Sequence, residues 1–307
     1  MKEGFKAGII VPILLIVVFG LILSVSFLPE SVLGINENPY FAVVVITLLT
    51  YALPTVFYCR LRGAGFTPKL RISLFPPSQI LYLLHASVFL LSGVVLVSML
   101  MYNMYPDAFA ASAVTEYAAF AMNDRFFDTL YIIIAFAWLP AVTEEVLFRG
   151  IVIGEYDRYG AGIACVMSAA VFAMSHFSAV RFPVYFFSGI VLSAVLFTTR
   201  SVVAAAIVHA VNNTVVILCE KYVLHIVDKQ NVSFVLMLIL LGAAAVFSAM
   251  LMCYEAYGIY RGYSEANVPS EYAQEAKYSL FARIAEAFFT PTFLILVILF
   301  IAALVSL

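Results

Sequence analysis

The chain has 307 residues, of which 64% are hydrophobic and only 11% are charged. A water-soluble globular protein is about 25% charged, because polar side chains must cover its surface, so this composition excludes a conventional soluble protein. The 16 Lys and Arg residues nearly balance the 18 Asp and Glu residues. This balance removes any general attraction for nucleic acid, and we expect no nucleic-acid partner.

Long hydrophobic runs follow one another along the chain, and strand-like alternation is sustained nowhere. A helix needs roughly 20 residues to cross about 30 Å of hydrocarbon, and several of the runs reach that length. We therefore predict an all-α fold, a polytopic transmembrane helical bundle with eight or nine spans, eight if the last run lies on the membrane surface. The spans are expected near residues 7–27, 40–59, 79–102, 128–157, 162–182, 183–200, 201–219, 232–254 and 284–307.

The orientation of such a bundle follows from its Lys and Arg residues, because positively charged short loops stay in the cytoplasm. With the N-terminus inside, twelve of these residues fall on the cytoplasmic side and four on the opposite side. We therefore expect an integral multi-pass protein of the cell membrane with a cytoplasmic N-terminus. The twelve are Lys2, Lys6, Arg60, Arg62, Lys69, Arg71, Arg149, Arg158, Arg200, Arg261, Lys277 and Arg283, and the four are Arg125, Arg181, Lys221 and Lys229.

The region before the last run contains an amphipathic stretch that begins at Ser270. Ser270 can cap a helix there, because a serine hydroxyl accepts a hydrogen bond from a backbone N–H of the first turn. Tyr278, Phe281, Ile284 and Phe288 share one face of that helix. We expect this face to lie in the headgroup layer and to anchor the chain, although a partner-binding surface is an alternative.

The fourth run places three charged side chains in the middle of an apolar helix: Glu144, Glu145 and Arg149. An ionisable group at the bilayer centre costs at least ~2.5 to 3.5 kcal/mol, so such groups need a partner or a function. Glu145 and Arg149 are four residues apart, which is the favourable spacing for a helical ion pair. Glu144 is rotated from Glu145 by about 100° and therefore lacks that partner.

Two later runs add polar side chains. His176 follows the chain reversal at 159–162 by about as many residues as Glu144 precedes it, so the two are expected at similar depth. In the seventh run, His209 and Asn213 are four apart and share a helical face.

The predicted span 183–200, between the runs that carry His176 and His209, contains Gly189 and Ser193. Their spacing of four residues lets helix backbones approach closely.

This set of residues suggests hydrolysis of an amide inside the membrane. A carboxylate in a water-poor cavity is a stronger base than in water, so Glu144 can deprotonate a water that His176 positions. His209 and Asn213 can donate hydrogen bonds to the oxyanion that forms when this water attacks a carbonyl. The HExxH and GxSxG motifs of common zinc and serine hydrolases are absent. Two histidines and a carboxylate also suit zinc, which stays an alternative at this point.

Each of these residues also has a purely structural interpretation. A single histidine or asparagine in a membrane helix more often joins helices by hydrogen bonds, and we interpret His85 and His225 in that way. The Glu145 and Arg149 pair can likewise serve only the fold. The four cysteines stand singly in apolar runs, which supports neither a disulfide framework nor a thiolate metal site.

Three motifs in consecutive order resemble those of a known family. EEVLFRG at 144–150, FAMSH at 172–176 and HAVNN at 209–213 are similar to the EExxxR, FxxxH and HxxxN motifs of the type II CAAX prenyl endopeptidases and bacteriocin-processing membrane proteases. The resemblance covers roughly residues 128–219. It divides the chain into N-terminal transmembrane helices with a polar loop (1–127), a catalytic CAAX-protease-like core (128–219), and C-terminal transmembrane helices with the interfacial helix (220–307).

The resemblance implies a metal-independent intramembrane endopeptidase that acts near the cytoplasmic face of the membrane, with no cofactor. It implies that Glu144 is the catalytic base, that His176 helps to activate water, and that His209 and Asn213 form the oxyanion hole. Glu145, Arg149 and Phe172 would then support the site. The expected partners are a peptide or lipid-modified protein substrate and membrane lipid, and the sequence indicates no oligomeric state.

Two other functions use the same residues. A non-catalytic membrane scaffold or bacteriocin immunity protein of the same fold would keep Glu145 and Arg149 but would not need Glu144 open to water. A proton-coupled transporter also uses intramembrane Glu and His, but it predicts paired broken helices in two repeats, and the sequence shows no repeat.

Overall fold

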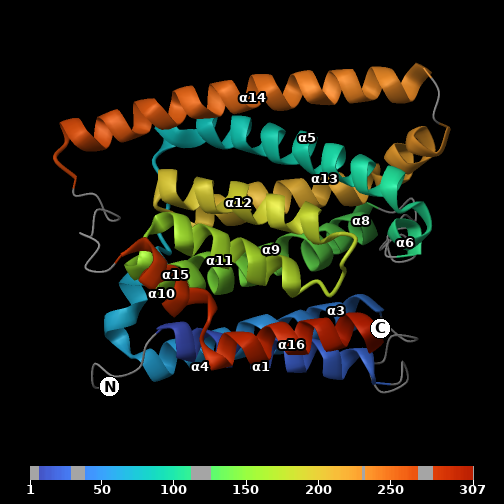
Figure 1. Ribbon diagram of the computed structural model, residues 1–307. Helices are drawn as coiled ribbons and strands as arrows, with labels where there is room; N and C mark the ends of the chain where they lie inside the picture. Colours follow the sequence, from blue (N-terminus) through green and yellow to red (C-terminus); the bar gives the residue numbers. More distant parts are fainter. Residues whose placement is uncertain (1–6, 29–38, 112–125, 230–231, 269–278, 307) are drawn as a thin grey trace.

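The computed structural model is a bundle of nearly parallel helices (Figure 1), and the part of the chain that it describes contains no β-strand. The predicted all-α polytopic bundle is therefore confirmed. The described residues are 7–28, 39–111, 126–229, 232–268 and 279–306.

Seven helices of the described chain are long and apolar enough to cross a membrane, and the number becomes eight if the bent pair at the C-terminus is one span. Of the predicted eight or nine spans, the described chain therefore reaches eight only if the bent pair is counted as one span. Several of these spans change helix type along their length. They are formed by α1 (Ala7–Ser26), α3–η1–α4 (Pro39–Thr47, Leu48–Ala52, Leu53–Arg62), η3–α5 (Pro77–Gln79, Ile80–Met104), α8–η4–α9–η5–α10–η6 (Phe126–Ile132, Ile133–Trp138, Leu139–Glu145, Val146–Val152, Ile153–Tyr156, Asp157–Tyr159), α12 (Phe182–Thr199), α13 (Val202–Lys229) and α14 (Val232–Glu265). Two short helices, η2 (Ala64–Leu70) and α6 (Pro106–Ala111), lie between spans.

The expected span 162–182 is shorter than predicted, because α11 covers only Ala161–Met174. The hydroxyl of Ser175 donates to the Phe172 carbonyl at 2.8 Å, and residues 175–181 then form turns before α12 begins. Pro183 stands in the first turn of α12, a position that proline favours because its missing N–H is not needed there. With 14 residues, α11 is an apolar helix that spans only part of the hydrocarbon layer.

The predicted last span, 284–307, is also interrupted. α15 (Leu280–Phe288) and α16 (Pro291–Ser306) meet at a bend of 54°. Pro291 cannot donate a backbone hydrogen bond to continue α15, and the hydroxyl of Thr290 instead accepts from the N–H of Phe293 at 3.3 Å. The cap of α15 is Ser279, whereas Ser270, the expected cap, and Tyr278 lie outside the described residues.

The helices that carry the three motifs lie in the middle of the bundle. In Figure 1, α14 and α5 cover one side and α1, α3 and α16 cover the other, with α9, α11, α12 and α13 between them. Two groups of buried apolar side chains fill the interior, one around α1, η5 and α11 and one around α5, α12 and α13. The motif helices are therefore held from both sides by apolar packing.

Within this core, α11 and α12 approach each other closely at Gly189. A Cβ atom at this position would lie 2.6 Å from Cα and 2.7 Å from Cβ of Ala169. These atoms belong to backbone and to a methyl group, so neither can move aside without shifting a helix. The close spacing expected from Gly189 and Ser193 is present.

We expect Gly189→Ala to lower the free energy of unfolding by about 1 to 3 kcal/mol, the usual cost of overpacking a tight core. The measurement is thermal unfolding of the purified protein in detergent. Gly20→Ala is the matched control, since a Cβ there meets nothing within 4 Å. Equal loss of stability in both variants would show that the α11–α12 contact does not limit packing.

Candidate active site

The two adjacent glutamates lie in a helix of mixed type. Glu144 and Glu145 are the last two residues of α9, which has a π-helical stretch on each side, η4 before it and η5 after it. Such stretches, with hydrogen bonds from i to i+5, are rare and occur often at functional sites, because they turn side chains away from the regular helical register. The local sequence gives no signal for them.

Glu145 and Arg149 form the predicted ion pair. Arg149 Nη1 donates to Glu145 Oε1 at 2.7 Å, and both side chains are 0% exposed. Arg149 Nη2 also donates to the carbonyl of Gly189 at 3.3 Å. The pair therefore joins its own helix to α12 at the point where α12 packs closely on α11.

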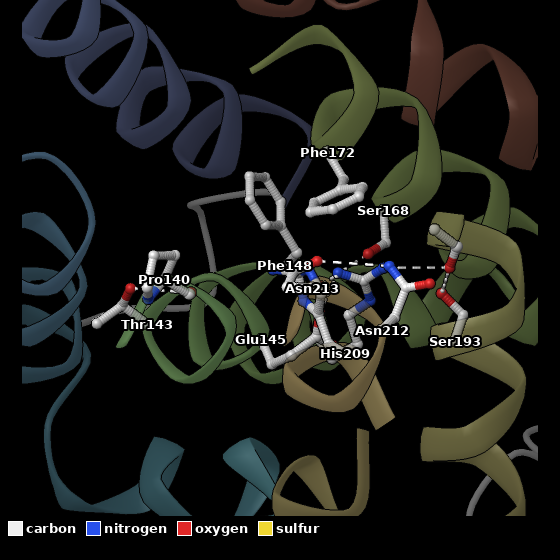
Figure 2. Close-up of polar contacts among 12 residues, drawn as sticks. Pro140, Thr143, Glu145, Phe148, Ser168, Phe172, Ser193, His209, Asn212 and Asn213 are labelled. Atoms are coloured by element: carbon white, nitrogen blue, oxygen red, sulfur yellow. Dashed lines mark hydrogen bonds and ion pairs between the residues drawn. The ribbon is translucent and has the colours of Figure 1, made fainter. Parts of the chain in front are cut away.

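His209 contacts the same carboxylate, which the sequence did not predict. Its Nδ1 lies 2.9 Å from Glu145 Oε1, and Figure 2 shows the imidazole of His209 beside Glu145. Because the carboxylate can only accept, Nδ1 carries the hydrogen. Nε2 can therefore donate a hydrogen bond to another group only when the imidazole is doubly protonated.

The aromatic ring of Phe172 lies at the centre of the three motifs. Its centroid is 4.9 Å from that of His176 and 5.6 Å from that of His209, and the guanidinium carbon of Arg149 lies 4.6 Å from it. Phe172 is 1% exposed. The ring therefore lies in contact with both histidines and with the guanidinium of the buried ion pair.

His176 follows the end of α11, and its ring is held by a hydrogen bond and by stacking. Its Nδ1 lies 2.9 Å from the Phe172 carbonyl, and its ring stacks on that of Tyr185 at 3.7 Å with an angle of 19° between the planes. Since the carbonyl accepts from Nδ1–H, Nε2 of the neutral ring is free of hydrogen and can accept a hydrogen bond from water. Tyr185 was missed in the sequence, because one tyrosine among many aromatic residues gives no signal.

Glu144 differs from Glu145 in having no hydrogen bond or ion pair with any described residue. Its side chain is buried, at 7% exposure, and it lines a cavity of about 290 Å³. His176, His209 and Asn213 line the same cavity. The other lining residues are Leu90, Val94, Ser98, Ile132, Phe136, Pro140, Phe172, Arg181, Val184, Tyr185, Ser188, Asn212, Val216 and Ile217.

Two neighbouring amides line this cavity. Asn212 Nδ2 donates to Asn213 Oδ1 at 3.4 Å, and Figure 2 shows both side chains near His209. Because Asn213 Oδ1 accepts this hydrogen bond, the Nδ2 group of Asn213 can donate to another acceptor. Asn212 is 8% exposed and orients its neighbour, a position that the sequence analysis did not assign to the site.

The zinc alternative finds no support in the arrangement of ligands. The described residues contain no group of three His, Cys, Asp or Glu side chains placed to hold a metal ion.

The other two histidines do not join the site. His85 lies in α5 and its buried Nδ1 has no hydrogen-bond partner among the described residues. It is not part of the cavity lining. The side chain of His225 is outside the described part of the chain.

Comparison with known proteins gives one match. Residues 126–215 match the protein family described as "Type II CAAX prenyl endopeptidase Rce1-like". No curated protein and no solved structure gives a significant match. The matched segment contains all three motifs, so the resemblance inferred from them is confirmed for this part of the chain.

Proposed function

Because the segment that carries the three motifs matches the type II CAAX prenyl endopeptidases, we propose that this multi-pass membrane protein is an intramembrane endopeptidase with Glu144 as its general base. The observation that carries the proposal is the contrast between two adjacent buried carboxylates. Glu145 is paired with Arg149 and His209, whereas Glu144 lines the cavity without a partner among the described residues. A free carboxylate in a membrane helix is costly and implies a function.

In the proposed reaction, Glu144 removes a proton from a water molecule that donates its other hydrogen to Nε2 of His176. The water oxygen bonds to the carbonyl carbon of the scissile peptide, and the carbonyl oxygen becomes an oxyanion. The C–N bond then breaks, and the proton held by Glu144 passes to the leaving amine. Water is consumed, and a carboxylate and an amine are produced, without oxidation or a cofactor.

The oxyanion is proposed to be stabilised by His209 and Asn213. Asn213 can donate through its amide, and the doubly protonated ring of His209 can donate through Nε2 while Nδ1 stays on Glu145. Glu145 then acts as a positioning residue for His209, in addition to pairing with Arg149. Hydrogen bonds arranged in advance around the developing charge are the usual source of stabilisation in acyl transfer.

The second function to consider is a non-catalytic scaffold or immunity protein of the same fold. It would use the Glu145, Arg149 and His209 cluster to hold helices together, and would have no use for an unpaired Glu144. The cavity beside Glu144 favours the enzyme, because a purely structural site gains nothing from an accessible carboxylate.

The test is digestion of a library of apolar peptides by the purified protein in detergent micelles, with new termini identified by mass spectrometry. We expect cleavage at defined bonds, unchanged by a strong metal chelator. A folded protein that cleaves no peptide and no prenylated peptide under these conditions would favour the scaffold.

Asn213→Ala is expected to lower kcat by about 10²- to 10³-fold with little change in KM, as measured on a cleaved peptide, because it removes a donor to the oxyanion. Asn212→Ala is the matched control from the adjacent residue and removes only the orientation of that donor. It should reduce kcat less. Equal effects of the two substitutions would remove Asn213 from the proposed oxyanion hole.

A further inference from the structure

His176 stands where the chain has left the regular helix, so the backbone alone does not define the direction of its side chain. It lies in the turns that connect α11 with α12, two helices that pack side by side (Figure 1). Its N–H donates to the Ala173 carbonyl at 3.3 Å, and the next residue, Phe177, has a positive φ of 45°. Such a left-handed residue is uncommon outside glycine and often follows the end of a helix. The orientation of the imidazole therefore depends on its side-chain contacts.

The hydrogen bond from Nδ1 of His176 to the Phe172 carbonyl, at 2.9 Å, fixes one atom of the ring. It opposes a ring flip, because a flipped imidazole would present a C–H group to the carbonyl in place of Nδ1–H. It does not stop the ring from swinging about the line between the two bonded atoms. The terminal side-chain dihedral of histidine has a broad energy minimum and does not prevent that motion either.

Tyr185 supplies the second constraint on the ring. The centroids of the Tyr185 and His176 rings are 3.7 Å apart, with 19° between the planes. The two faces are thus in contact, and the imidazole cannot tilt toward Tyr185 without overlapping the phenol ring. Phe172 meets both rings at steep angles, 72° with His176 and 86° with Tyr185. The hydrogen bond and the stacked face together define both the position and the plane of the imidazole.

Tyr185 is itself held by the start of α12. Its N–H donates to the Arg181 carbonyl at 3.1 Å, and the Ser178 hydroxyl accepts from the Arg181 N–H at 3.2 Å. Pro183, in the first turn of α12, has its φ angle fixed by its own ring. The backbone that carries Tyr185 therefore belongs to a regular helix with an ordered start, whereas the backbone of His176 lies between helices. Of the two stacked rings, that of Tyr185 is the fixed reference.

From this arrangement we propose that Tyr185 is a positioning residue for peptide hydrolysis, whose stacked ring holds Nε2 of His176 in place to accept a hydrogen bond from the attacking water. The inference rests on the proposed function for the role of His176. Tyr185 lines the same cavity as Glu144, but it acts through the imidazole and not on the substrate. What the site requires at this position is the flat face of an aromatic ring, and the hydroxyl has no part in it.

The effect of losing this face is on the chemical step. A displacement of about 1 Å in a reacting group can cost 10²-fold in rate, because the water is then no longer aligned with the carbonyl carbon. Binding of the substrate does not depend on Nε2 of His176, so the loss should fall on kcat and not on KM.

Two substitutions separate the ring from its hydroxyl. Tyr185→Leu removes the aromatic face and should lower kcat for a cleaved peptide by about 10- to 10²-fold with little change in KM. Tyr185→Phe keeps the face, removes only the hydroxyl, and should keep most of the kcat. Phe182→Leu is the matched control, since Phe182 stacks on Phe186 in the same helix at 12° between the planes but does not line the cavity. It should leave kcat unchanged.

Three kinetic results would overturn the inference. Tyr185→Phe as slow as Tyr185→Leu would assign the effect to the hydroxyl. A Tyr185→Leu variant with the wild-type kcat would show that the stack is not needed, and one with a raised KM alone would place Tyr185 in contact with the substrate. Should Tyr185→Leu fail to fold, Tyr185→Met is used with the same expectation, because the unbranched methionine side chain adapts to an irregular gap.

The positioning itself is measured without any substrate, by NMR of the full-length protein in detergent micelles with isotope-labelled histidine. The chain has four histidines, and the signals of His176 are those that disappear in His176→Ala. In the wild type and in Tyr185→Phe the imidazole of His176 should have the order parameter of a rigid group, about 0.85, and in Tyr185→Leu the value should fall below about 0.6. Equal values in the wild type and in Tyr185→Leu would overturn the inference.

This second measurement separates the inference from the proposed function. A folded wild-type protein that cleaves no peptide would contradict the proposed function. The order parameters would still decide whether Tyr185 holds the imidazole of His176, because they are measured on the protein alone.

Discussion

Glu144→Gln is expected to lower kcat for peptide cleavage by about 10²- to 10⁴-fold, the usual contribution of a general base, and to leave the fold intact. The substitution keeps the shape of the side chain but removes its ability to accept a proton from water. The fold should tolerate it, because Glu144 has no hydrogen bond or ion pair with the described residues that could be lost. The measurements are the rate of cleavage of a fluorogenic peptide and the thermal unfolding temperature in the same detergent.

The matched control is Ser98→Ala. Ser98 lines the same cavity from α5 and has no assigned part in the reaction. Its substitution should change kcat little, which would show that altering the lining is not enough to stop cleavage. Full activity of Glu144→Gln would exclude Glu144 as the base, whereas a misfolded Glu144→Gln would show that this carboxylate is structural.

Glu145→Gln is expected to have the largest effect on stability, lowering the free energy of unfolding by about 3 to 5 kcal/mol. The substitution leaves the buried guanidinium of Arg149 without its ion-pair partner and removes the charged acceptor of His209. In a low-dielectric interior, burying a single charge costs far more free energy than burying an ion pair. Thermal unfolding in detergent and the folded yield after purification measure the effect.

The exposed pair Arg261 and Glu265 provides the control for burial. Its atoms are also 2.7 Å apart at a spacing of four residues, but the side chains are 68% and 64% exposed. Water solvates either charge when the other is removed, so Glu265→Gln should not change the unfolding temperature measurably.

A second control replaces both members of the buried pair. The double variant Glu145→Leu with Arg149→Met should recover much of the stability lost in Glu145→Gln, because neither buried charge remains. A double variant as unstable as the single one would show that the cost comes from packing rather than from the unpaired charge.

The sequence predicted the parts of this site that depend on spacing along one helix. Glu145 and Arg149 are four residues apart, and this spacing brings them together in an α-helix and in a π-helix. The similar depth of Glu144 and His176 followed from counting residues on either side of one turn, and both side chains line the same cavity.

Contacts between helices far apart in the sequence were not predicted. His209 and Glu145 are separated by 64 residues, and the spacing of His209 and Asn213 says nothing about which helix they face. The stacking of Tyr185 on His176 and the π-helical stretches around Glu144 likewise depend on packing. For these features the three-dimensional structure is required.

The break between α15 and α16 could have been predicted from the sequence. Thr290 and Pro291 form a cap followed by a residue without an N–H, which is typical of the start of a new helix. The prediction of one continuous span over 284–307 gave more weight to hydropathy than to these two residues. Ser279 stands before α15 and caps it in the same way.

The most direct test of the central claim is a single turnover of the purified protein, in excess over a cleavable peptide, in water enriched in ¹⁸O. If Glu144 activates water, the new carboxylate of the product should carry one ¹⁸O atom and the side chain of Glu144 should carry none, as determined by mass spectrometry of the product and of the digested protein. Label in Glu144, or a product carboxylate without label, would mean that the glutamate attacks the peptide itself and would contradict its assignment as a general base.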